Sequence, residues 1–321
     1  MYAIVEVMRF KHIIIFQNPK STNAEKVKQK IALIKKMYGK KNVTILQTSA
    51  QGDEENQNIL EKHAQLLGTS TLLCVAAGDG TTHGIIQALL SSKELQNVRS
   101  TPVLPIWGGN ANDLAVMLNG SDTNNIEYII EQGKLVKIYP LKCVVKKSKS
   151  IKTYLATNYL SFGASAKIAH KINSPEHRKS RLHKYIGGKR LQELITGAKA
   201  LFSTSVAKIK TKAGRRKTMF ESIYANGPRM ARLSSLPIEL TDKAFYQITI
   251  PSNKFFSVLQ KFLHLFTHHF DKKSIKQTHP ISFIAESDIY VQFDGEAELI
   301  RSGSEVTIAI HESPFYSIST M

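Results

Sequence analysis

The chain has 321 residues, 42% of them hydrophobic and 21% charged, which is the composition of a globular protein. That length exceeds one ordinary core, so we expect two domains. There is no run of about 18 apolar residues, so we expect no membrane-spanning helix, and the first ten residues do not resemble a secretory signal. Cys74 and Cys143 lie in apolar runs and predict buried thiols, which suits a reducing cytoplasm.

The net charge of +19 predicts an anionic partner. It is uneven, because the stretch from Lys167 to Lys217 holds 15 lysines and arginines against two glutamates, a difference of +13. We expect this stretch to face an anionic membrane surface. A solvated protein surface is the plain alternative. Nucleic acid is not the expected partner, because aromatic residues for base stacking are sparse there.

In chain order, the first third alternates short apolar runs with helical patterns. Strands are predicted at residues 12–16, 42–47, 71–77 and 101–107, and helices at 24–38, at 53–67 and beyond the turn that starts at Gly78. This alternation predicts a parallel sheet covered by helices.

After about Leu135 the pattern becomes mostly strands, with helical insertions near 182–201 and 255–270. The strands are expected at residues 135–145, 151–160, 206–212, 220–225, 245–250, 289–293 and 305–310. The predicted fold class is therefore α/β, with an N-terminal Rossmann-like parallel-sheet domain over residues 1–135 and a C-terminal antiparallel β-sandwich domain over 136–321. Return of the last strand to the first domain is left open.

Three turns follow three strands of the predicted parallel sheet, at residues 18–22, 78–81 and 108–113. The carboxyl ends of parallel strands share one edge, where ligands bind. Glycines let backbone N–H groups approach phosphate oxygens, and the helices that follow add their positive dipole ends. Each turn alone is typical of an ordinary loop, but together they predict a nucleotide site in which Asp79 and Asp113 hold magnesium or orient polar groups.

The segment Ala77-Gly78-Asp79-Gly80-Thr81 resembles the GGDGT signature of the diacylglycerol kinase catalytic domain. Three further segments follow in the family's order. Asn18-Pro19-Lys20-Ser21 resembles its NPxSG turn, residues 109–115 resemble its GTxNDFA segment, and Asp294-Gly295-Glu296 resembles its DGE motif. The superfamily also includes sphingosine and ceramide kinases and, more distantly, NAD kinases.

The resemblance implies an ATP site between the two domains and transfer of the γ-phosphate to a lipid hydroxyl, with Mg²⁺ as cofactor. Asp294 and Glu296 are then the catalytic candidates for accepting the hydroxyl proton. A structural magnesium site of the bacterial lipid kinases maps onto Glu239, Asp242 and Ala244, although Lys243 replaces the family's glycine. The residues implied to bind the nucleotide are Asn18, Pro19, Lys20, Ser21, Thr22, Thr48, Ala77, Gly78, Asp79, Gly80, Thr81, Thr82, His83, Gly109, Asn110, Asn112 and Asp113.

Three departures from the family pattern, Ala77, His83 and Asn110, leave two other functions open. One is an NAD kinase-like enzyme, and the other is a basic nucleotide- or lipid-binding protein with impaired catalysis. The partners expected for the lipid kinase are a lipid substrate and an anionic membrane surface, and a homodimer is left open. The expected location is the cytoplasm, with peripheral association at the inner face of the membrane.

Overall fold

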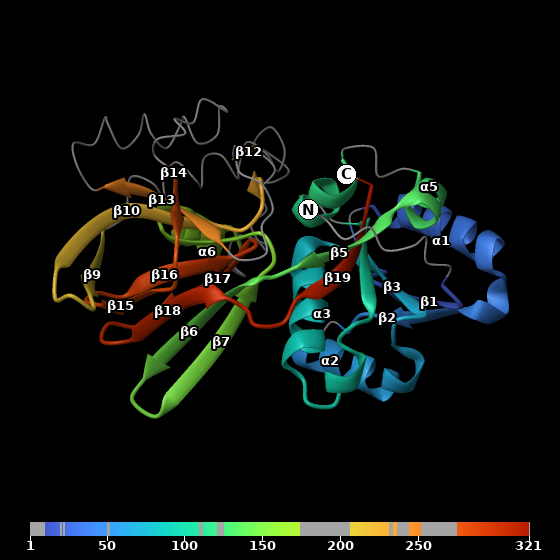
Figure 1. Cartoon of the computed structure of the whole chain (residues 1–321), viewed down its shortest axis with the longest axis horizontal. Helices are drawn as coiled ribbons and strands as arrows, with labels where there is room; N and C mark the ends of the chain where they lie inside the picture. The colour runs from blue at the N-terminus through green and yellow to red at the C-terminus, as the bar shows by residue number, and fades with distance from the viewer. Residues whose placement is uncertain are drawn as a thin grey trace, which may run out of the picture. The chain divides into compact units, whose positions relative to one another are not determined.

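The computed structural model describes residues 10–19, 21, 23–49, 52–108, 112–120, 125–173, 206–230, 234–235, 244–251 and 275–320. The chain divides into two compact units (Figure 1). The first contains residues 1–140 and the C-terminal residues 311–321, and the second contains most of the chain between them.

The first unit is built on one mixed sheet of six strands in the order β2-β1-β3-β4-β19-β5. The strands from β1 to β4 run parallel, and β19 is parallel to β4 but antiparallel to β5. The last strand of the chain therefore completes the first unit's sheet. The bounds are β1 His12–Gln17, β2 Val43–Gln47, β3 Thr71–Ala77, β4 Pro102–Trp107, β5 Lys134–Ile138 and β19 Phe315–Ser319.

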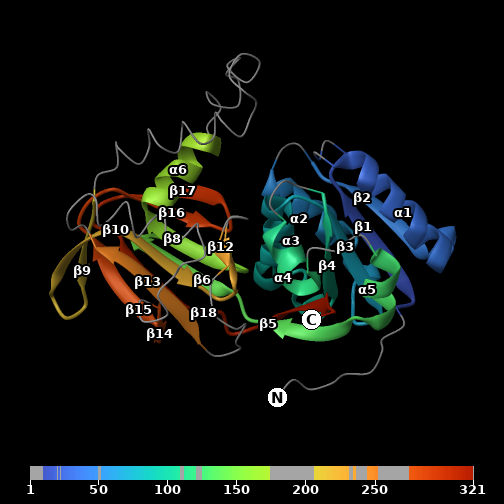
Figure 2. The same cartoon turned by 90° about the horizontal axis from the view of Figure 1, so that it is seen from above.

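Helices cover both faces of this sheet, as Figure 2 shows. On one face α1 buries Val27, Ile31 and Ile34 and α5 buries its own isoleucines, because apolar residues three or four apart share one side of a helix. The other face is covered by α2, α3 and α4. The helix bounds are α1 Ala24–Tyr38, α2 Asp53–Lys62, α3 Asp79–Ser91, α4 Asp113–Asn119 and α5 Ile126–Gln132, with short 3₁₀ turns at Lys40–Asn42, Ala64–Leu66 and Gln96–Val98.

The second unit is an antiparallel sheet with the strand path β17-β16-β8-β10-β9-β15-β18-β6-β7, joined by β13 and β14. The sheet curls around a single core, as the contact between β7 and β16 shows. The rings of Tyr154 in β7 and Phe293 in β16 are stacked, with their centroids 4.5 Å apart. This curl brings β7 and β16, which lie far apart along the strand path, into contact. The bounds are β6 Leu141–Lys147, β7 Ser150–Ala156, β8 Tyr159–Gly163, β9 Ala207–Thr211, β10 Arg216–Ala225, β13 Phe245–Pro251, β14 Ile275–Thr278, β15 Ile281–Ala285, β16 Ile289–Phe293, β17 Glu296–Ile300 and β18 Glu305–Ile310.

A helix, α6 Ala164–Asn173, follows β8 and packs on β16 and β17. A short pair, β11 Arg229–Met230 and β12 Ser234–Ser235, forms a separate ribbon. None of the helices in the described ranges is long and apolar enough to cross a bilayer.

The predicted fold class is confirmed, with two corrections to the predicted strands. The single strand expected at 135–145 is two strands in different sheets, because Pro140 interrupts the run between β5 and β6. The single strand expected at 151–160 is also two, β7 and β8, separated by a turn at Thr157 and Asn158. A smaller difference is that α3 begins at Asp79, so Gly80 and Thr81 belong to its first turn rather than to a loop.

Candidate nucleotide and acceptor sites

The turns predicted to bind the nucleotide do meet at one edge of the first unit's sheet. In the order β2-β1-β3-β4 the direction of chain progression reverses between β1 and β3, which is where ligands of open α/β sheets bind. The turn after β1 is tied to β3, since the Asn18 N–H donates to the Ala76 carbonyl at 3.1 Å. Thr48, directly after β2, is tied to β1 by its N–H bond to the Gln17 carbonyl at 2.9 Å.

The turn after β1 leaves a hydroxyl facing inward. The Ser21 N–H donates to the Asn18 carbonyl at 3.1 Å, and the Asn23 N–H donates to the Gly108 carbonyl at 3.3 Å, which connects this turn to the end of β4. The Ser21 Oγ is buried and has no hydrogen-bond partner among the described residues. A buried polar atom without a partner costs stability, so it indicates a place where a ligand oxygen or a water is bound.

The ends of β3 and β4 approach each other so closely that only glycine fits at position 108. A Cβ placed there would lie 2.9 Å from the Ala77 nitrogen and 3.0 Å from its carbonyl oxygen. Beyond this contact, the Asp79 Oδ2 accepts a hydrogen bond of 2.6 Å from the Asn112 N–H. Asp79 therefore holds Asn112, the N-cap residue of α4.

The N-terminus of α3 lies at the same edge, directly after β3. Gly78 is the N-cap and Asp79 the first helical residue, and the first-turn N–H groups of a helix have no intrahelical acceptor. Thr82 and His83 are buried within this helix, and Asp113 is buried at the start of α4. The residues brought to this edge are Asn18, Pro19, Ser21, Thr48, Ala77, Gly78, Asp79, Gly80, Thr81, Thr82, His83, Asn112 and Asp113, whereas Lys20, Thr22, Gly109 and Asn110 lie outside the described residues.

The described residues contain no cluster of three or more histidine, cysteine or acidic side chains that would hold a metal by themselves. For the predicted magnesium site in the second unit, Glu239 and Asp242 lie outside the described residues, and Ala244 directly precedes β13. Magnesium is commonly bound by one or two carboxylates together with substrate phosphates. Asp79 and Asp113 at the sheet edge fit that mode of binding.

The two catalytic candidates lie in the second unit, at the hairpin between β16 and β17. Asp294 and Gly295 form its two-residue turn with φ values of 47° and 103°, as the primed hairpin turns require. Glu296 opens β17 and is exposed.

The Asp294 carboxylate is held by the turn between β7 and β8. Its Oδ2 accepts from the Thr157 N–H at 2.5 Å and from the Thr157 hydroxyl at 2.8 Å, and its Oδ1 accepts from the N–H groups of Asn158 and Tyr159, both at 3.0 Å. The Asp294 N–H in turn donates to the Tyr159 carbonyl at 3.1 Å. These five hydrogen bonds fix the hairpin turn against the start of β8.

A third carboxyl group in this unit, that of Glu221, was not singled out from the sequence. Glu221 in β10 is fully buried, and its carboxyl accepts from the Ser165 N–H at 2.7 Å and hydrogen-bonds to the Ser165 hydroxyl at 2.6 Å. Burial raises the pKa of Glu221 from 4.5 to about 8, although the hydrogen bonds from Ser165 act in the opposite direction. The sequence signal for it is one charged residue within the apolar pattern of β10.

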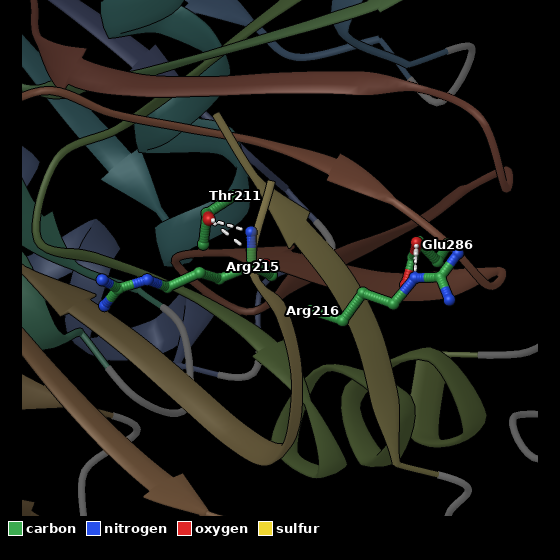
Figure 3. Close-up of polar contacts among 4 residues, drawn as sticks. All are labelled: Thr211, Arg215, Arg216 and Glu286. Carbon is green, nitrogen blue, oxygen red and sulfur yellow. Dashed lines mark hydrogen bonds and ion pairs between the residues drawn. The ribbon is translucent and has the colours of Figure 1, made fainter. Parts of the chain in front are cut away.

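Part of the basic stretch forms an exposed hairpin of β9 and β10, with six basic and no acidic residues from Ala207 to Thr218. Figure 3 shows its tip, where the Arg215 N–H donates to the Thr211 hydroxyl at 3.2 Å. The Arg216 side chain extends in the opposite direction to that of Arg215. Its Nε donates to the Glu286 Oε1 at 2.9 Å, while the side chain stays 79% exposed. Residues 174–205 of the predicted membrane-facing stretch lie outside the described residues.

Comparison with known proteins identifies the kind of fold that carries these sites. Residues 12–143 match the family model described as the diacylglycerol kinase catalytic domain. The crystal structure of a diacylglycerol kinase from Bacillus anthracis str. Sterne is similar at a TM-score of 0.63 and 14% identity, over 97% of this chain and 98% of that one. The yeast NADH kinase complexed with NADH is similar at a TM-score of 0.52 and 13% identity, over 98% and 84%. No curated protein matches the chain.

Proposed function

We propose that this protein transfers the γ-phosphate of ATP to the hydroxyl of a lipid, since residues 12–143 match the diacylglycerol kinase catalytic-domain family model. The observation that carries the proposal is the meeting of three turns at the switch point of the first sheet, with the unpaired Ser21 hydroxyl and the α3 N-terminus among them. Phosphoryl transfer depends chiefly on positioning and charge neutralisation, and this edge provides both.

At the nucleotide side, backbone N–H groups at the α3 N-terminus bind phosphate oxygens, and the Ser21 hydroxyl donates to one of them. Asp79 keeps the N-cap residue of α4 in place by accepting a hydrogen bond from the Asn112 N–H. When bound with the nucleotide, Mg²⁺ neutralises phosphate charge, and Asp79 and Asp113 are the carboxylates suited to hold it.

At the acceptor side, the Asp294 and Glu296 pair supplies the group that takes the proton from the lipid hydroxyl. A carboxylate within hydrogen-bond reach can act as this general base, which is typically worth about 10²–10⁴-fold in rate. The five hydrogen bonds at Asp294 support the proposal, because they fix the hairpin turn on which both residues lie.

The direct experiment is incubation of the purified protein with labelled ATP, Mg²⁺ and, separately, diacylglycerol, sphingosine, ceramide, NAD or no acceptor. Label transfer to a lipid is expected. Transfer to NAD alone would support the NAD kinase-like alternative, whose fold is represented among the similar structures by the yeast NADH kinase. Transfer to none of them would support a binding protein without catalysis.

Asp79→Ala is the matched test of the nucleotide edge. Loss of the Asp79 carboxylate frees the Asn112 N–H, so transfer should be abolished while the fold is retained. The control is Asp288→Ala, which removes an exposed carboxylate paired with Arg301 and should leave transfer unchanged. Wild-type turnover in Asp79→Ala would contradict the nucleotide assignment.

The lipid substrate implies a membrane surface, and the basic stretch from Lys167 to Lys217 supports reversible attachment to anionic lipid. This would place the protein in the cytoplasm, at the inner face of the membrane.

A further inference from the structure

Three turns of the second unit meet at Asn158. The Asn158 N–H donates to the Asp294 Oδ1 at 3.0 Å, which connects it to the β16–β17 hairpin. The Asn158 carbonyl accepts from the N–H groups of Asn226 and Gly227, at 2.8 and 3.2 Å, which connects it to the end of β10. The backbone of Asn158 is therefore fixed from two sides.

The side chain of Asn158 takes no part in these bonds. The residue is 1% exposed, and neither its Oδ1 nor its Nδ2 has a hydrogen-bond partner in the described part of the chain. Burying an amide without partners lowers the stability of a fold. Since the contacts to Asp294, Asn226 and Gly227 use only the backbone of residue 158, an apolar side chain would serve the fold better. The asparagine therefore indicates a function that offsets this loss of stability.

We propose that the Asn158 carboxamide binds the hydroxyl of the phosphoryl acceptor. A carboxamide offers a donor and an acceptor side by side, and an alcohol both donates and accepts, so one neutral hydroxyl satisfies atoms that the fold leaves unpaired. An anionic group is disfavoured, because the Asp294 carboxylate is bound to the same residue's N–H.

This inference rests on the proposed kinase function and adds to it a residue that selects the acceptor. It places the reacting oxygen at a side chain that is 1% exposed, next to the turn that the Asp294 carboxylate holds. Such burial favours transfer to an alcohol over transfer to water.

The test compares Asn158→Leu with Asn119→Leu. Asn119 is also a buried asparagine, but its amide is paired, since it donates to the Ile318 carbonyl at 3.4 Å and accepts from the Thr320 N–H at 3.2 Å. Asn158→Leu should keep or raise the Tm and lower kcat/KM for the lipid at least tenfold, with KM for ATP unchanged. Asn119→Leu should lower the Tm and leave both KM values unchanged. Asn158→Ala, which cannot clash, should repeat the kinetic result.

Two results would overturn the inference. One is a wild-type kcat/KM for the lipid in Asn158→Ala, and the other is a fall in Tm for both Asn158 variants that matches the fall in Asn119→Leu. Binding of dioctanoylglycerol, followed by thermal shift without turnover, separates this inference from the proposed function. If the wild-type protein transfers phosphate to no lipid, the kinase proposal fails. The Asn158 inference then stands if dioctanoylglycerol stabilises the wild type but not Asn158→Ala, and falls if it stabilises both or neither.

Discussion

The Asp294 carboxylate accepts four hydrogen bonds, whereas the neighbouring Glu296 side chain is exposed, and this difference separates their structural roles. In Asp294→Asn an NH₂ group must face N–H donors, so both the Tm and kcat should fall. In Glu296→Gln no such conflict arises, so kcat should fall by about 10²–10⁴-fold without a change in Tm. Steady-state kinetics and thermal unfolding of both variants check this.

The Asp294 and Glu296 assignment has a clear contrary outcome. If both variants keep a near-normal kcat while KM for ATP is unchanged, the proton acceptor lies elsewhere, and Asp242 and Asp113 become the next candidates. Glu298→Gln, on the same strand and also exposed, is the control for the removal of a carboxylate charge.

The pKa of Glu221 makes the free energy of unfolding depend on pH. Because the pKa is about 8 in the folded protein and 4.5 ordinarily, the folded state holds the proton that the unfolded state releases between these values. Stability should therefore fall as the pH rises from about 4.5 to 8, and the loss should be complete above the folded pKa. Urea unfolding from pH 5 to 9 measures the slope. Glu221→Gln should flatten the dependence of the unfolding free energy on pH, whereas the control Glu286→Gln should not. An unchanged slope in Glu221→Gln would show that other groups cause the pH dependence.

At the scale of the elements, the strands from β1 to β4 and their helices could be predicted from the sequence, because period and turn residues are local signals. The turn at Thr157 and Asn158 could not, since no glycine or proline marks it. The N–H groups of this turn donate to the Asp294 carboxylate, which lies 136 residues further along the chain than Asn158. The acceptor side was therefore only partly predictable. The Asp294-Gly295-Glu296 motif could be identified from the sequence, but the turn that binds it, at Thr157 and Asn158, has the sequence pattern of the middle of a strand.

The curl of the second sheet was likewise only partly predictable. Alternating patterns indicated antiparallel strands, but the stacking of Tyr154 on Phe293 joins β7 to β16, which are not neighbours along the strand path. At the nucleotide edge, spacing predicted which turns come together. It did not predict that Asp79 would accept from the Asn112 N–H, which depends on the left-handed φ of 56° at Asn112.

The close contact between β3 and β4 provides a test at this scale. In Gly108→Ala the new methyl group would lie 2.9 Å from the Ala77 nitrogen, so backbone must move at the strand ends that form the nucleotide edge. We expect a loss of about 1–3 kcal/mol in stability and a higher KM for ATP. Gly214→Asn is the control, because its turn is open and asparagine tolerates φ of +77°. An unchanged KM for ATP in Gly108→Ala would place the phosphates away from this contact.

For the whole molecule, the net charge of +19 raises the question of whether membrane attachment depends on total charge or on one surface. The β9–β10 hairpin is a described surface with six basic and no acidic residues from Ala207 to Thr218. Each basic residue near an anionic bilayer contributes about 1 kcal/mol, so replacing Lys210, Lys212 and Arg215 with glutamine should weaken vesicle binding about 10²-fold. The matched control replaces Lys35, Lys36 and Lys40 of the first unit, which removes the same charge elsewhere.

Sedimentation with phosphatidylserine-containing and with neutral vesicles, at low and high salt, distinguishes the two cases. If the hairpin is the attachment surface, only its variant releases the anionic vesicles, and high salt releases the wild type, because exposed charges are screened. If both triple variants bind equally weakly, the attraction comes from total charge. Equal binding of the wild type to neutral and anionic vesicles would contradict electrostatic attachment. Tighter binding to duplex nucleic acid than to anionic vesicles would instead make nucleic acid the partner of the basic stretch, although its few aromatic residues argue against base stacking.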